Sequence, residues 1–283
     1  MQRFYPFLFV FLWSTGFIGA KYGLPYAEPL SFLLTRYGLV IALMSCLALI
    51  TRAPWPKDKM QWLHISVSGL LVHAVYLGGV FIAIKHGLPA GITALLVGMQ
   101  PLLTGFGAGW LLGEKVSGRQ WAGLGLGFVG VSLVVSGKIG EAALGPMLIP
   151  AIVALLGITA GTLYQKRFCA KFDLRSGSVI QFVPTALVTA IAVAVFEDYH
   201  IEWNGHFVFA LGWLVLVLSI GAISLLNLLI GTGSAVNVAS LFYLTPPTTA
   251  LIAWGIFGEN LSLTAIIGML VAVSGVYLVA KPK

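Results

Sequence analysis

The chain repeats itself at a fixed offset of 145 residues, and this repeat limits the folds that it can adopt. Aligned without a gap, residues 91–135 match residues 236–280 at 13 of 45 positions. The matches fall on residues that shape turns and backbone, among them Pro101 and its counterpart Pro246. Each copy contains an odd number of apolar runs long enough to cross a bilayer, so the second copy starts on the opposite side from the first. The repeat therefore predicts two related halves that are inverted relative to one another.

The composition is that of a membrane protein. With 59% apolar and 9% charged residues, the chain has more apolar surface than a water-soluble core of its size could bury. A helix needs roughly 20 apolar residues to span a bilayer, and ten runs approach that length, at about 4–24, 31–51, 62–84, 89–113, 117–136, 144–163, 177–197, 206–230, 235–257 and 262–280. We therefore predict an all-α integral membrane protein of ten transmembrane helices. These helices form two inverted five-helix repeats, residues 1–143 and residues 144–283.

The basic residues indicate which loops face the cytoplasm, because Lys and Arg are enriched in cytoplasmic loops. With the N-terminus inside, twelve of the 16 basic residues fall on the inner side, and Lys21, Lys85 and Lys138 fall on the outer side. The loop after the second run is basic and the equivalent loop after the seventh is acidic, as expected for equivalent loops on opposite sides. We predict that both termini are cytoplasmic. The net charge of +7 is then a topology signal, and no nucleic acid is expected as a partner.

The sequence contains no constellation typical of a membrane enzyme. All nine acidic residues lie in loops or at the ends of runs, the five histidines are scattered, and no spacing suggests a metal site. A P-loop motif is also missing from the sequence, so the chain does not itself hydrolyse ATP. We expect no catalytic residue, no metal ion and no cofactor. A membrane-embedded enzyme or a lipid-handling scaffold stays open as an alternative from another class.

Two equivalent runs are interrupted by proline. Pro101 and Pro246 each follow a polar residue, Gln100 or Thr245, and Pro247 extends the interruption in the second copy. Proline frees a backbone carbonyl one turn earlier, and freed backbone at membrane depth is tolerated only against protein or a water-filled cavity. A kink that only improves helix packing is the alternative. Because the interruption recurs in both halves, it favours a solute site with these prolines as helix breaks or gates, as in secondary transporters.

Two residues away from the ends of the runs can carry a charge. His73 lies near the centre of the third run, and Tyr76 follows on the same helical face. The charge of a histidine can change near neutral pH. Three roles are therefore open for His73: it binds solute, it carries a coupling proton, or it forms a neutral hydrogen bond to a neighbouring helix. Arg36 lies one to two turns inside the outer end of the second run. We expect Arg36 to extend to the headgroups as an anchor, with anion binding as the alternative.

Other polar and aromatic residues within the runs are weaker candidates. Trp13 is too deep for the interfacial belt, so it either packs or forms a stacking wall, and Ser14 follows it. Tyr164 lies at the end of the sixth run, and Asn227 and Tyr243 lie in the eighth and ninth runs. Hydroxyl groups often bond a local backbone carbonyl instead of a ligand.

Further patterns are assigned to packing and turns. Gly123 and Gly127 are spaced four residues apart, as where helix backbones approach closely. Glu114 ends the fourth run after a glycine, and Ser117 and Ser262 are placed to cap the helices that follow. We expect these residues to have structural roles.

Several short stretches together match a known family pattern. They are Trp13-Ser14-Thr15-Gly16-Phe17 closing on Lys21, the stretch 83–101, and Gly113-Glu114 followed by Gln120, Gly123 and Gly130-Val131. In these features the chain resembles the drug/metabolite transporter superfamily, specifically its EamA-type exporters. The resemblance implies alternating access and efflux of amino acids, related metabolites or toxic analogues across the bacterial inner membrane. It also implies a central cavity lined chiefly by spans 1, 3, 4, 6, 8 and 9, with spans 5 and 10 packed outside.

The resemblance also implies a set of substrate-binding positions, namely Trp13, Ser14, His73, Tyr76, Gln100, Tyr164, Asn227, Tyr243 and Thr245. The sequence thus predicts a secondary transporter that exports small neutral or zwitterionic metabolites, such as amino acids. A dianion such as a sugar phosphate is not expected, because it would require Arg or Lys at depth. An uptake permease or facilitator for a similar solute is the alternative. The expected partners are a small-molecule substrate and membrane lipid, and the expected state is a monomer or homodimer.

Overall fold

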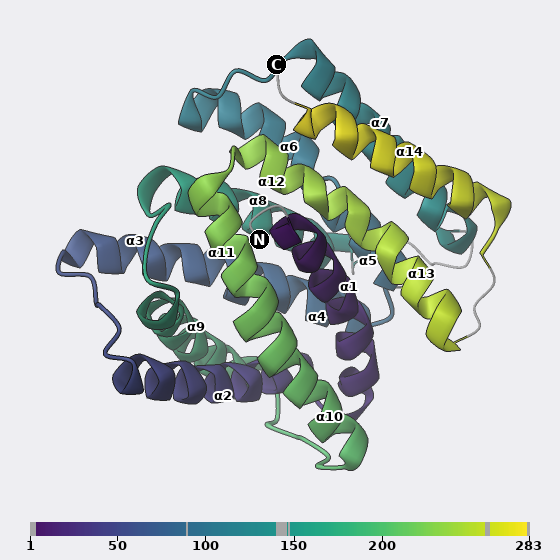
Figure 1. Cartoon of the computed structure of the whole chain (residues 1–283). Coiled ribbons are helices and arrows are strands. Elements are labelled where there is room, and N and C mark those ends of the chain that lie inside the picture. Colours follow the sequence, from purple (N-terminus) through teal and green to yellow (C-terminus); the bar gives the residue numbers. More distant parts are fainter. Residues whose placement is uncertain (1–3, 89, 140–145, 147, 258–260, 282–283) are drawn as a thin grey trace.

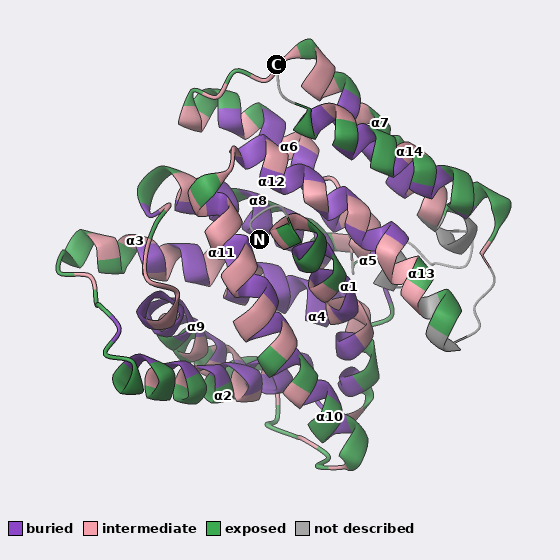
Figure 2. Ribbon diagram, viewed as in Figure 1, coloured by how far each residue is buried: buried purple, intermediate pink, exposed green. Residues whose placement is uncertain are grey.

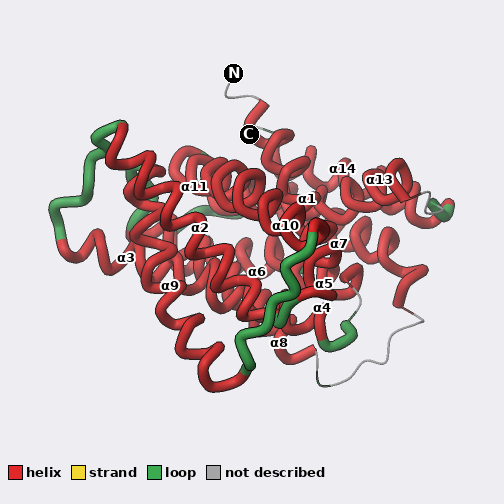
Figure 3. The backbone as a smooth tube through the Cα atoms, turned by 90° about the horizontal axis from the view of Figure 1, so that it is seen from below, coloured by secondary structure: helices red, strands yellow, loops and turns green. Residues whose placement is uncertain are grey.

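The computed structural model describes residues 4–88, 90–139, 146, 148–257 and 261–281. Over these residues the chain is helical apart from its connecting loops, as Figure 3 shows. One isolated antiparallel bridge between Ala27 and Ile201 is also present. The fold is therefore all-α in the described part of the chain.

The apolar runs form helices, several of which change character along their length (Figure 1). In chain order the elements are α1 (Tyr5–Gly23), η2 (Leu24–Tyr26), α2 (Pro29–Ile50), α3 (Lys59–Gly69), η3 (Leu70–Leu77), α4 (Gly78–Lys85), α5 (Ala90–Val97), α6 (Gln100–Gly107), η4 (Ala108–Leu112), α7 (Gly118–Ile139), α8 (Leu148–Phe168), α9 (Leu174–Phe196), α10 (Gly205–Trp213), η5 (Leu214–Ala222), α11 (Ile223–Thr232), α12 (Ala235–Ser240), η6 (Leu241–Leu244), α13 (Thr245–Phe257) and α14 (Leu263–Ala280). The elements η3, η4 and η5 are π-helical, and η2 and η6 are 3₁₀-helical.

Among the described residues, nine continuous helical segments are long and apolar enough to cross a bilayer. They are Tyr5–Tyr26, Pro29–Ile50, Lys59–Lys85, Ile92–Leu112, Leu148–Phe168, Leu174–Phe196, Gly205–Thr232, Ala235–Ile252 and Leu263–Ala280. The run predicted at 117–136 is present as helix α7, but α7 is not among these nine. A multi-pass helical membrane protein is confirmed, whereas the count of ten spans and the inverted arrangement stay predictions.

The outer surface is that of a protein surrounded by lipid. In Figure 2 the buried faces of the helices turn toward one another and the exposed faces turn outward. Large apolar side chains on the outward faces are widely exposed, including Leu49, Ile191 and Leu270. A water-soluble monomer rarely exposes contiguous apolar surface on this scale.

The N-terminus of α2 is capped by a residue from the second half of the chain. The Glu197 carboxylate accepts hydrogen bonds from the backbone N–H groups of Leu30 and Ser31 and from the Ser31 hydroxyl, each at 2.9 Å. The first N–H groups of a helix have no partner within the helix, and the positive end of the helix dipole favours a carboxylate there. Glu197 therefore fixes the start of α2 against the end of α9.

The residues assigned to turns have structural roles. Gly113 adopts a left-handed conformation with φ of 67° and ends η4. The Glu114 carboxylate accepts a hydrogen bond from the Ala235 N–H at 3.0 Å, which caps α12. The Ser117 hydroxyl accepts from the Gln120 N–H at 3.3 Å, and the Ser262 hydroxyl caps α14. These predictions are confirmed.

Helices α7 and α14 lie side by side along their length and form one edge of the molecule (Figure 1). A Cβ atom added to Gly123 would lie 2.7 Å from the Gly275 carbonyl oxygen, and one added to Gly130 would lie 2.3 Å from the Ala272 nitrogen. One added to Gly268 would lie 2.6 Å from the Gly130 carbonyl oxygen. The two backbones therefore approach closely only because these positions lack side chains. We call this contact the glycine seam, and it confirms the packing role predicted for Gly123.

Candidate functional site

Three small cavities follow one another through the middle of the helical bundle. The first, the Arg36 cavity, is bordered by Trp13, Arg36 and Tyr76 and has a volume of about 40 Å³. The second, the Pro246 cavity, shares Trp13 with the first and has a volume of about 10 Å³. The third, the Lys166 cavity, shares Phe242 with the second and also has a volume of about 10 Å³. Each of the two smaller cavities has room for about one water molecule.

The walls of these cavities come from both halves of the chain. The Arg36 cavity is formed by α1, α2, η3, α4, η5 and α11. The Pro246 cavity adds α5, η6 and α13, and the Lys166 cavity adds α6, α8 and α12. In Figure 1 these helices surround α1, while α7 and α14 lie at the edge. Residues of α7 and α14 do not line any of the three cavities.

Two π-helices face each other across the Arg36 cavity. They are η3 and η5, and at the offset of the repeat η3 corresponds to residues 215–222, which lie within η5. Tyr76 and Leu77 come from η3, and Leu214 and Leu218 come from η5. The wider turn of a π-helix is frequent at functional sites because it redirects side chains. The same local irregularity has thus formed in both halves, on the two sides of one cavity.

Aromatic rings separate the first cavity from the second and third. The ring of Trp13 stacks on Tyr76, with centroids 6.3 Å apart and an interplanar angle of 10°. The same ring meets Phe242 edge-on at 5.2 Å, and Phe9 packs against both. Trp13 is 5% exposed and borders both the Arg36 and the Pro246 cavities, so it acts both in packing and as a wall.

The helix interruptions lie at equivalent residues. In the first half α5 stops at Val97 and α6 starts at Gln100; in the second half, after η6, α13 starts at Thr245, the repeat equivalent of Gln100. Pro101 and Pro246 therefore occupy the first turn of a new helix, where the missing N–H is not needed. Pro246 also borders the second cavity.

Ser14 joins α1 to the broken helix of the second half. Its hydroxyl donates to the Val10 carbonyl at 2.6 Å and lies 3.3 Å from the Thr245 carbonyl oxygen. The Thr249 hydroxyl donates to the Ser14 carbonyl at 3.1 Å. Ser14 is fully buried, and the Thr245 hydroxyl has no hydrogen-bond partner among the described residues. This contact places the helix break against α1.

The Lys166 cavity has the most polar wall of the three. The Gln100 amide donates to the Thr162 hydroxyl at 3.3 Å, and the Gln100 carbonyl oxygen has no partner among the described residues. The Lys166 ammonium donates to the carbonyl oxygens of Ile230 at 2.9 Å and Gly233 at 2.6 Å. Lys166 thus satisfies the free carbonyls at the end of α11, whereas Gln100 keeps an acceptor free.

The anchoring role expected for Arg36 is wrong. Arg36 is 3% exposed and borders the first cavity instead of extending to the headgroups. Its Nε donates to the Ser219 hydroxyl in η5 at 2.9 Å. The hydrophobic periodicity of the sequence does not reveal that Arg36 points inward, because α2 is apolar on most of its circumference. The spans therefore do contain a buried cation. Because such a cation is present, an anionic solute is no longer disfavoured.

His73 lies one turn from Tyr76 but does not line these cavities. Its ring is fully buried and stacks on Phe182 of α9, with centroids 4.1 Å apart and an interplanar angle of 17°. Neither ring nitrogen has a hydrogen bond that meets normal geometry among the described residues, although Gln181 lies beside the ring. The His73 carbonyl accepts from the Tyr37 hydroxyl at 2.8 Å. His73 therefore lies in the layer between η3, α2 and α9.

Two of the remaining candidates lie away from the three cavities. The Tyr164 hydroxyl bonds His64 Nδ1 at 2.8 Å between α8 and α3. Tyr243 is fully buried against α7, where a Cβ added to Gly127 would lie 2.3 Å from its ring, and its hydroxyl has no partner among the described residues.

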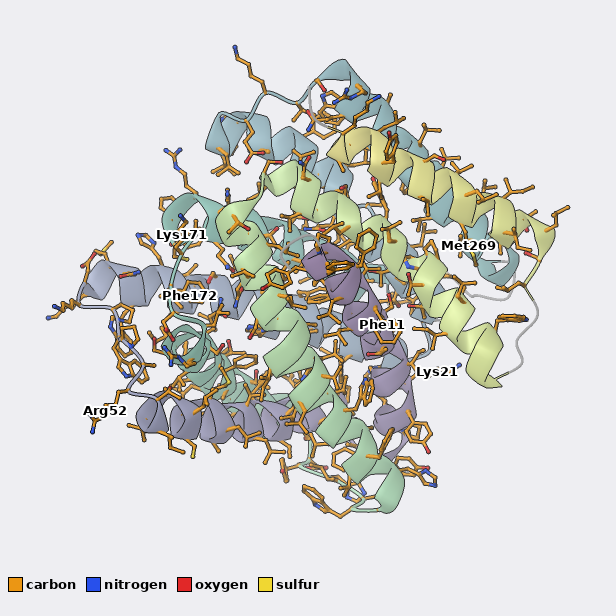
Figure 4. The ribbon with its side chains drawn as sticks, in the orientation of Figure 1. Phe11, Lys21, Arg52, Lys171, Phe172 and Met269 are labelled. Carbon is orange, nitrogen blue, oxygen red and sulfur yellow. The ribbon has the colours of Figure 1, made fainter. Side chains whose placement is uncertain are left out.

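Asn227 belongs to a buried network of side-chain amides. It accepts from the Gln165 amide at 3.0 Å and donates to Gln181 at 3.3 Å, and Gln181 donates to Ser68 at 3.1 Å. Asn227 also borders a separate cavity of about 170 Å³ beside the α8–α9 connection, where Figure 4 labels Lys171. The network ties α8, α9, α11 and α3 together.

Side chains that could ligate a metal ion are scattered over the described residues. Within the residues that the structure describes, no group of three His, Cys, Asp or Glu side chains could hold a metal ion. Two of the described carboxylates, those of Glu114 and Glu197, are used as helix caps.

Comparison with known proteins assigns the chain to a family of transporters. The model of the EamA-like transporter family matches residues 4–136 and 145–281. The chain belongs to this family of membrane transporters, within the drug/metabolite transporter superfamily. The family and the names of its relatives indicate a transporter rather than an enzyme.

Named relatives cover nearly the whole chain. The uncharacterized transporter YvbV of Bacillus subtilis (strain 168) is 28% identical over 95% of this chain and 88% of its own. The uncharacterized inner membrane transporter YedA of Escherichia coli (strain K12) is 26% identical over 98% of this chain and 90% of its own. A probable amino-acid metabolite efflux pump of Escherichia coli (strain K12) is 23% identical over 96% of this chain and 92% of its own.

A solved structure shares the fold. A protein crystal structure superimposes with a TM-score of 0.78 at 20% sequence identity, covering 98% of this chain and 95% of that chain. The helical arrangement described above is therefore one that has been observed by crystallography.

Proposed function

We propose that this protein is a ten-helix secondary carrier that moves small zwitterionic or neutral metabolites, such as amino acids, out of the cell by alternating access. The observation that carries the proposal is the row of three cavities separated by the aromatic contact between Trp13 and Phe242. All three are smaller than an amino acid, as in a carrier closed to both sides. Helix α7, packed against the apolar helix α14, supplies the tenth span.

In this proposal the two halves are inverted and both termini are cytoplasmic. The Arg36 cavity then faces the outer side, because Arg36 lies in the second turn of α2, which starts outside. The Lys166 cavity faces the cytoplasm, because Lys166 lies in the last turn of α8. Transport would require Trp13 and Phe242 to separate, with the broken helices moving at Gln100 and Thr245. The cavities would then merge into one site that opens to one side of the membrane at a time.

Export is favoured over uptake by the names of two relatives. Probable amino-acid metabolite efflux pumps of Escherichia coli and Salmonella typhimurium are 23% and 22% identical to this chain. An inner-membrane relative, YedA, supports the bacterial inner membrane as the location. Among the nine proposed binding residues, four border at least one of the three cavities and have the strongest support: Trp13, Tyr76, Gln100 and Thr245.

The test is counterflow in liposomes that contain the purified protein. Trans-stimulated uptake of one or a few labelled amino acids from a panel would support a carrier, and oriented vesicles with a solute gradient would assign the direction. Flux that requires no counter-solute and does not saturate would argue for a channel. Conversion of a solute to a new product would argue for the enzyme alternative.

We also propose His73 as the group that couples transport to protons, because it is buried beside Tyr76 and both ring nitrogens lack regular hydrogen bonds to the described residues. The substitution His73→Gln keeps a polar side chain of similar size but cannot gain a charge. It should flatten any pH dependence of counterflow and leave solute binding measurable. The exposed His86, changed to Gln, is the control. An unchanged pH profile in His73→Gln would exclude His73 as the proton carrier.

A further inference from the structure

The Arg36 cavity contains a buried cation that is not neutralised by the described part of the protein. Arg36 is 3% exposed, and its only hydrogen bond among the described residues runs from Nε to the neutral hydroxyl of Ser219. Of the residues that line the cavity, Arg36 is the one that carries a charge. A guanidinium presents five N–H donors, so its outer fork remains available on the side of the cavity.

Two acidic side chains beside the start of α2 are used elsewhere. Glu28 pairs with Lys85 at 3.5 Å, and Glu197 caps the start of α2. The described ion pairs do not include Arg36. Burial of a charge without a counter-charge is unfavourable, and such a residue within a membrane-spanning segment is normally part of a solute or ion pathway. The missing counter-charge therefore points to a bound anion.

The rest of the cavity is suited to an apolar body. Besides Arg36, its wall is formed by aromatic rings such as Trp13, Phe17 and Tyr76 and by aliphatic side chains such as Leu214 and Leu218. Acidic residues do not occur among its lining residues, so a substrate ammonium would find no carboxylate there. Its volume of about 40 Å³ corresponds to roughly three water molecules, which is the size of one carboxylate, so the apolar body of a solute would fit only when the carrier opens.

We propose that Arg36 binds the carboxylate of the transported solute in a bidentate manner, with Ser219 as a positioning residue, and that the solute needs no amino group to be recognised. The inference rests on the proposed carrier function and names the solute class as monocarboxylates with an apolar body. The planar fork of arginine matches the two oxygens of a carboxylate. The bond to Ser219 holds Nε on the η5 side and leaves the two terminal nitrogens for the carboxylate.

The position in the repeat supports a role that only one half performs. The counterpart of Arg36 at the repeat offset is Gln181, which is bonded to Ser68 and Asn227 in the buried amide network. A charge that served only to hold the fold would be expected to have an ion-pair partner, and Arg36 has none among the described residues.

The first experiment compares solutes that share a body and differ in their charged groups. The purified protein is titrated with leucine, 4-methylpentanoate and leucinamide, and with phenylalanine, 3-phenylpropanoate and phenylalaninamide, and binding is read from the shift of its melting temperature. Both the amino acid and the deaminated acid of at least one body should stabilise the protein, and the matching amide should not. Equal stabilisation by amide and acid, or stabilisation by none of the acids, would overturn the proposal.

The second experiment uses Arg36→Gln, which installs the residue found at the equivalent position of the other half. Loss of charge-assisted hydrogen bonds should weaken acid binding by about 10- to 100-fold. Arg36→Lys should recover only part of the affinity, because an ammonium lacks the fork. Arg52→Gln is the matched control, because Arg52 follows α2 at its opposite end and is exposed (Figure 4).

A structural role and a binding role predict opposite changes in the ligand-free protein. If Arg36 serves the solute, ligand-free Arg36→Gln should melt at the same temperature as the wild type or higher, because a buried unpaired charge has been removed. A lower melting temperature with an unchanged acid affinity would show that Arg36 only ties α2 to η5. Ser219→Ala should weaken acid binding a few-fold, and Ser219→Thr, which keeps the hydroxyl, should restore it.

Counterflow separates failure of this inference from failure of the carrier function. If wild-type liposomes exchange a solute and Arg36→Gln liposomes exchange it with the same half-saturating concentration, the carboxylate assignment is wrong and the carrier function stands. If wild-type liposomes exchange no solute of either set, acids and amides alike, both proposals fail for these solute classes.

Discussion

The glycine seam and the Arg36 cavity use the repeat in opposite ways. In the seam, equivalent residues have the same packing role, since Gly123 meets Gly275 and Gly130 meets Gly268, each pair crossing from one half to the other. At the cavity, equivalent residues differ, since the counterpart of Arg36 is Gln181. Two related halves can pack closely when equivalent positions in both halves lack side chains. A solute does not have two equivalent halves, so its site requires different side chains from each half.

Because of this difference, we predict that substitutions in the cavity alter transport and that substitutions in the seam alter only stability. The largest effect is expected for Trp13→Ala, which removes a ring in contact with Phe9, Tyr76 and Phe242. Removal of a buried tryptophan side chain typically lowers the free energy of unfolding by about 3–5 kcal/mol. It should also join two cavities and permit solute leak without counter-solute.

Unfolding of the detergent-solubilised protein and passive solute efflux from liposomes measure these two effects. Trp254→Ala is the control, because Trp254 is 56% exposed on α13. A tight, coupled carrier after Trp13→Ala would contradict the assignment of Trp13 as part of the barrier.

The second effect tests the seam. Gly130→Ala places a Cβ atom 2.3 Å from the Ala272 nitrogen, so α7 and α14 must separate. Overpacking of this kind lowers the free energy of unfolding by about 1–3 kcal/mol. Gly125→Ala is the control on the same helix, because a Cβ there meets no atom within 4 Å. A change in solute preference after Gly130→Ala would break the distinction between seam and cavity.

The third effect compares the two equivalent positions. Gln181→Leu breaks the hydrogen bonds to Ser68 and Asn227 and leaves buried polar groups unpaired. The expected loss in the free energy of unfolding is about 1–2 kcal/mol. Relative affinities for acid and amide solutes should stay unchanged, in contrast to Arg36→Gln. Leu187→Ala, at an exposed position of α9, is the control for effects on that helix. If Gln181→Leu altered the acid preference, both positions would belong to one site.

The smallest effect lies outside both regions, at the start of α9. Asp173 caps α9 through the Arg175 N–H, and the Arg175 side chain lowers the pKa of the Asp173 carboxyl below its ordinary value of 3.8. A lowered pKa adds stability above the unfolded pKa, and that stability is lost as the pH falls through the folded value. Because the pair is partly exposed, the contribution should stay below about 1 kcal/mol.

Melting temperatures of the wild type and Asp173→Asn, measured between about pH 7 and pH 3, test this expectation. Asparagine still caps the helix, so the variant isolates the charge. The wild type should be more stable near neutral pH, and the difference should shrink below about pH 4. A constant difference across the range would mean that the charge contributes nothing.

Much of the architecture follows from the sequence because it depends on local features. The length of the apolar runs predicts membrane-spanning helices, and the recurrence of proline predicts breaks that the structure places at Gln100 and Thr245. Ser117 and Ser262 cap the helices that follow them, as turn chemistry predicts. Each of these features is decided within a few residues of the chain.

Side-chain placement is predicted less well. Four of the predicted residues border the three cavities: Trp13, Tyr76, Gln100 and Thr245. In contrast, His73, Tyr164 and Tyr243 pack between helices away from these cavities. Arg36 is expected at the headgroups and lies inside. The signal that could have identified it is its position two turns within an otherwise uncharged run, opposite a glutamine in the repeat.

By itself the sequence determined that this chain is a helical membrane protein of two related halves, with a helix break at the same place in each. Only the tertiary structure decided which face of each helix turns inward. In a soluble helix the apolar stripe marks the buried face, but lipid is as apolar as the interior of this protein. The rotation of each helix, and with it the burial of Arg36, is therefore set by contacts between helices, such as the Glu197 cap on α2 and the bond from Arg36 to Ser219.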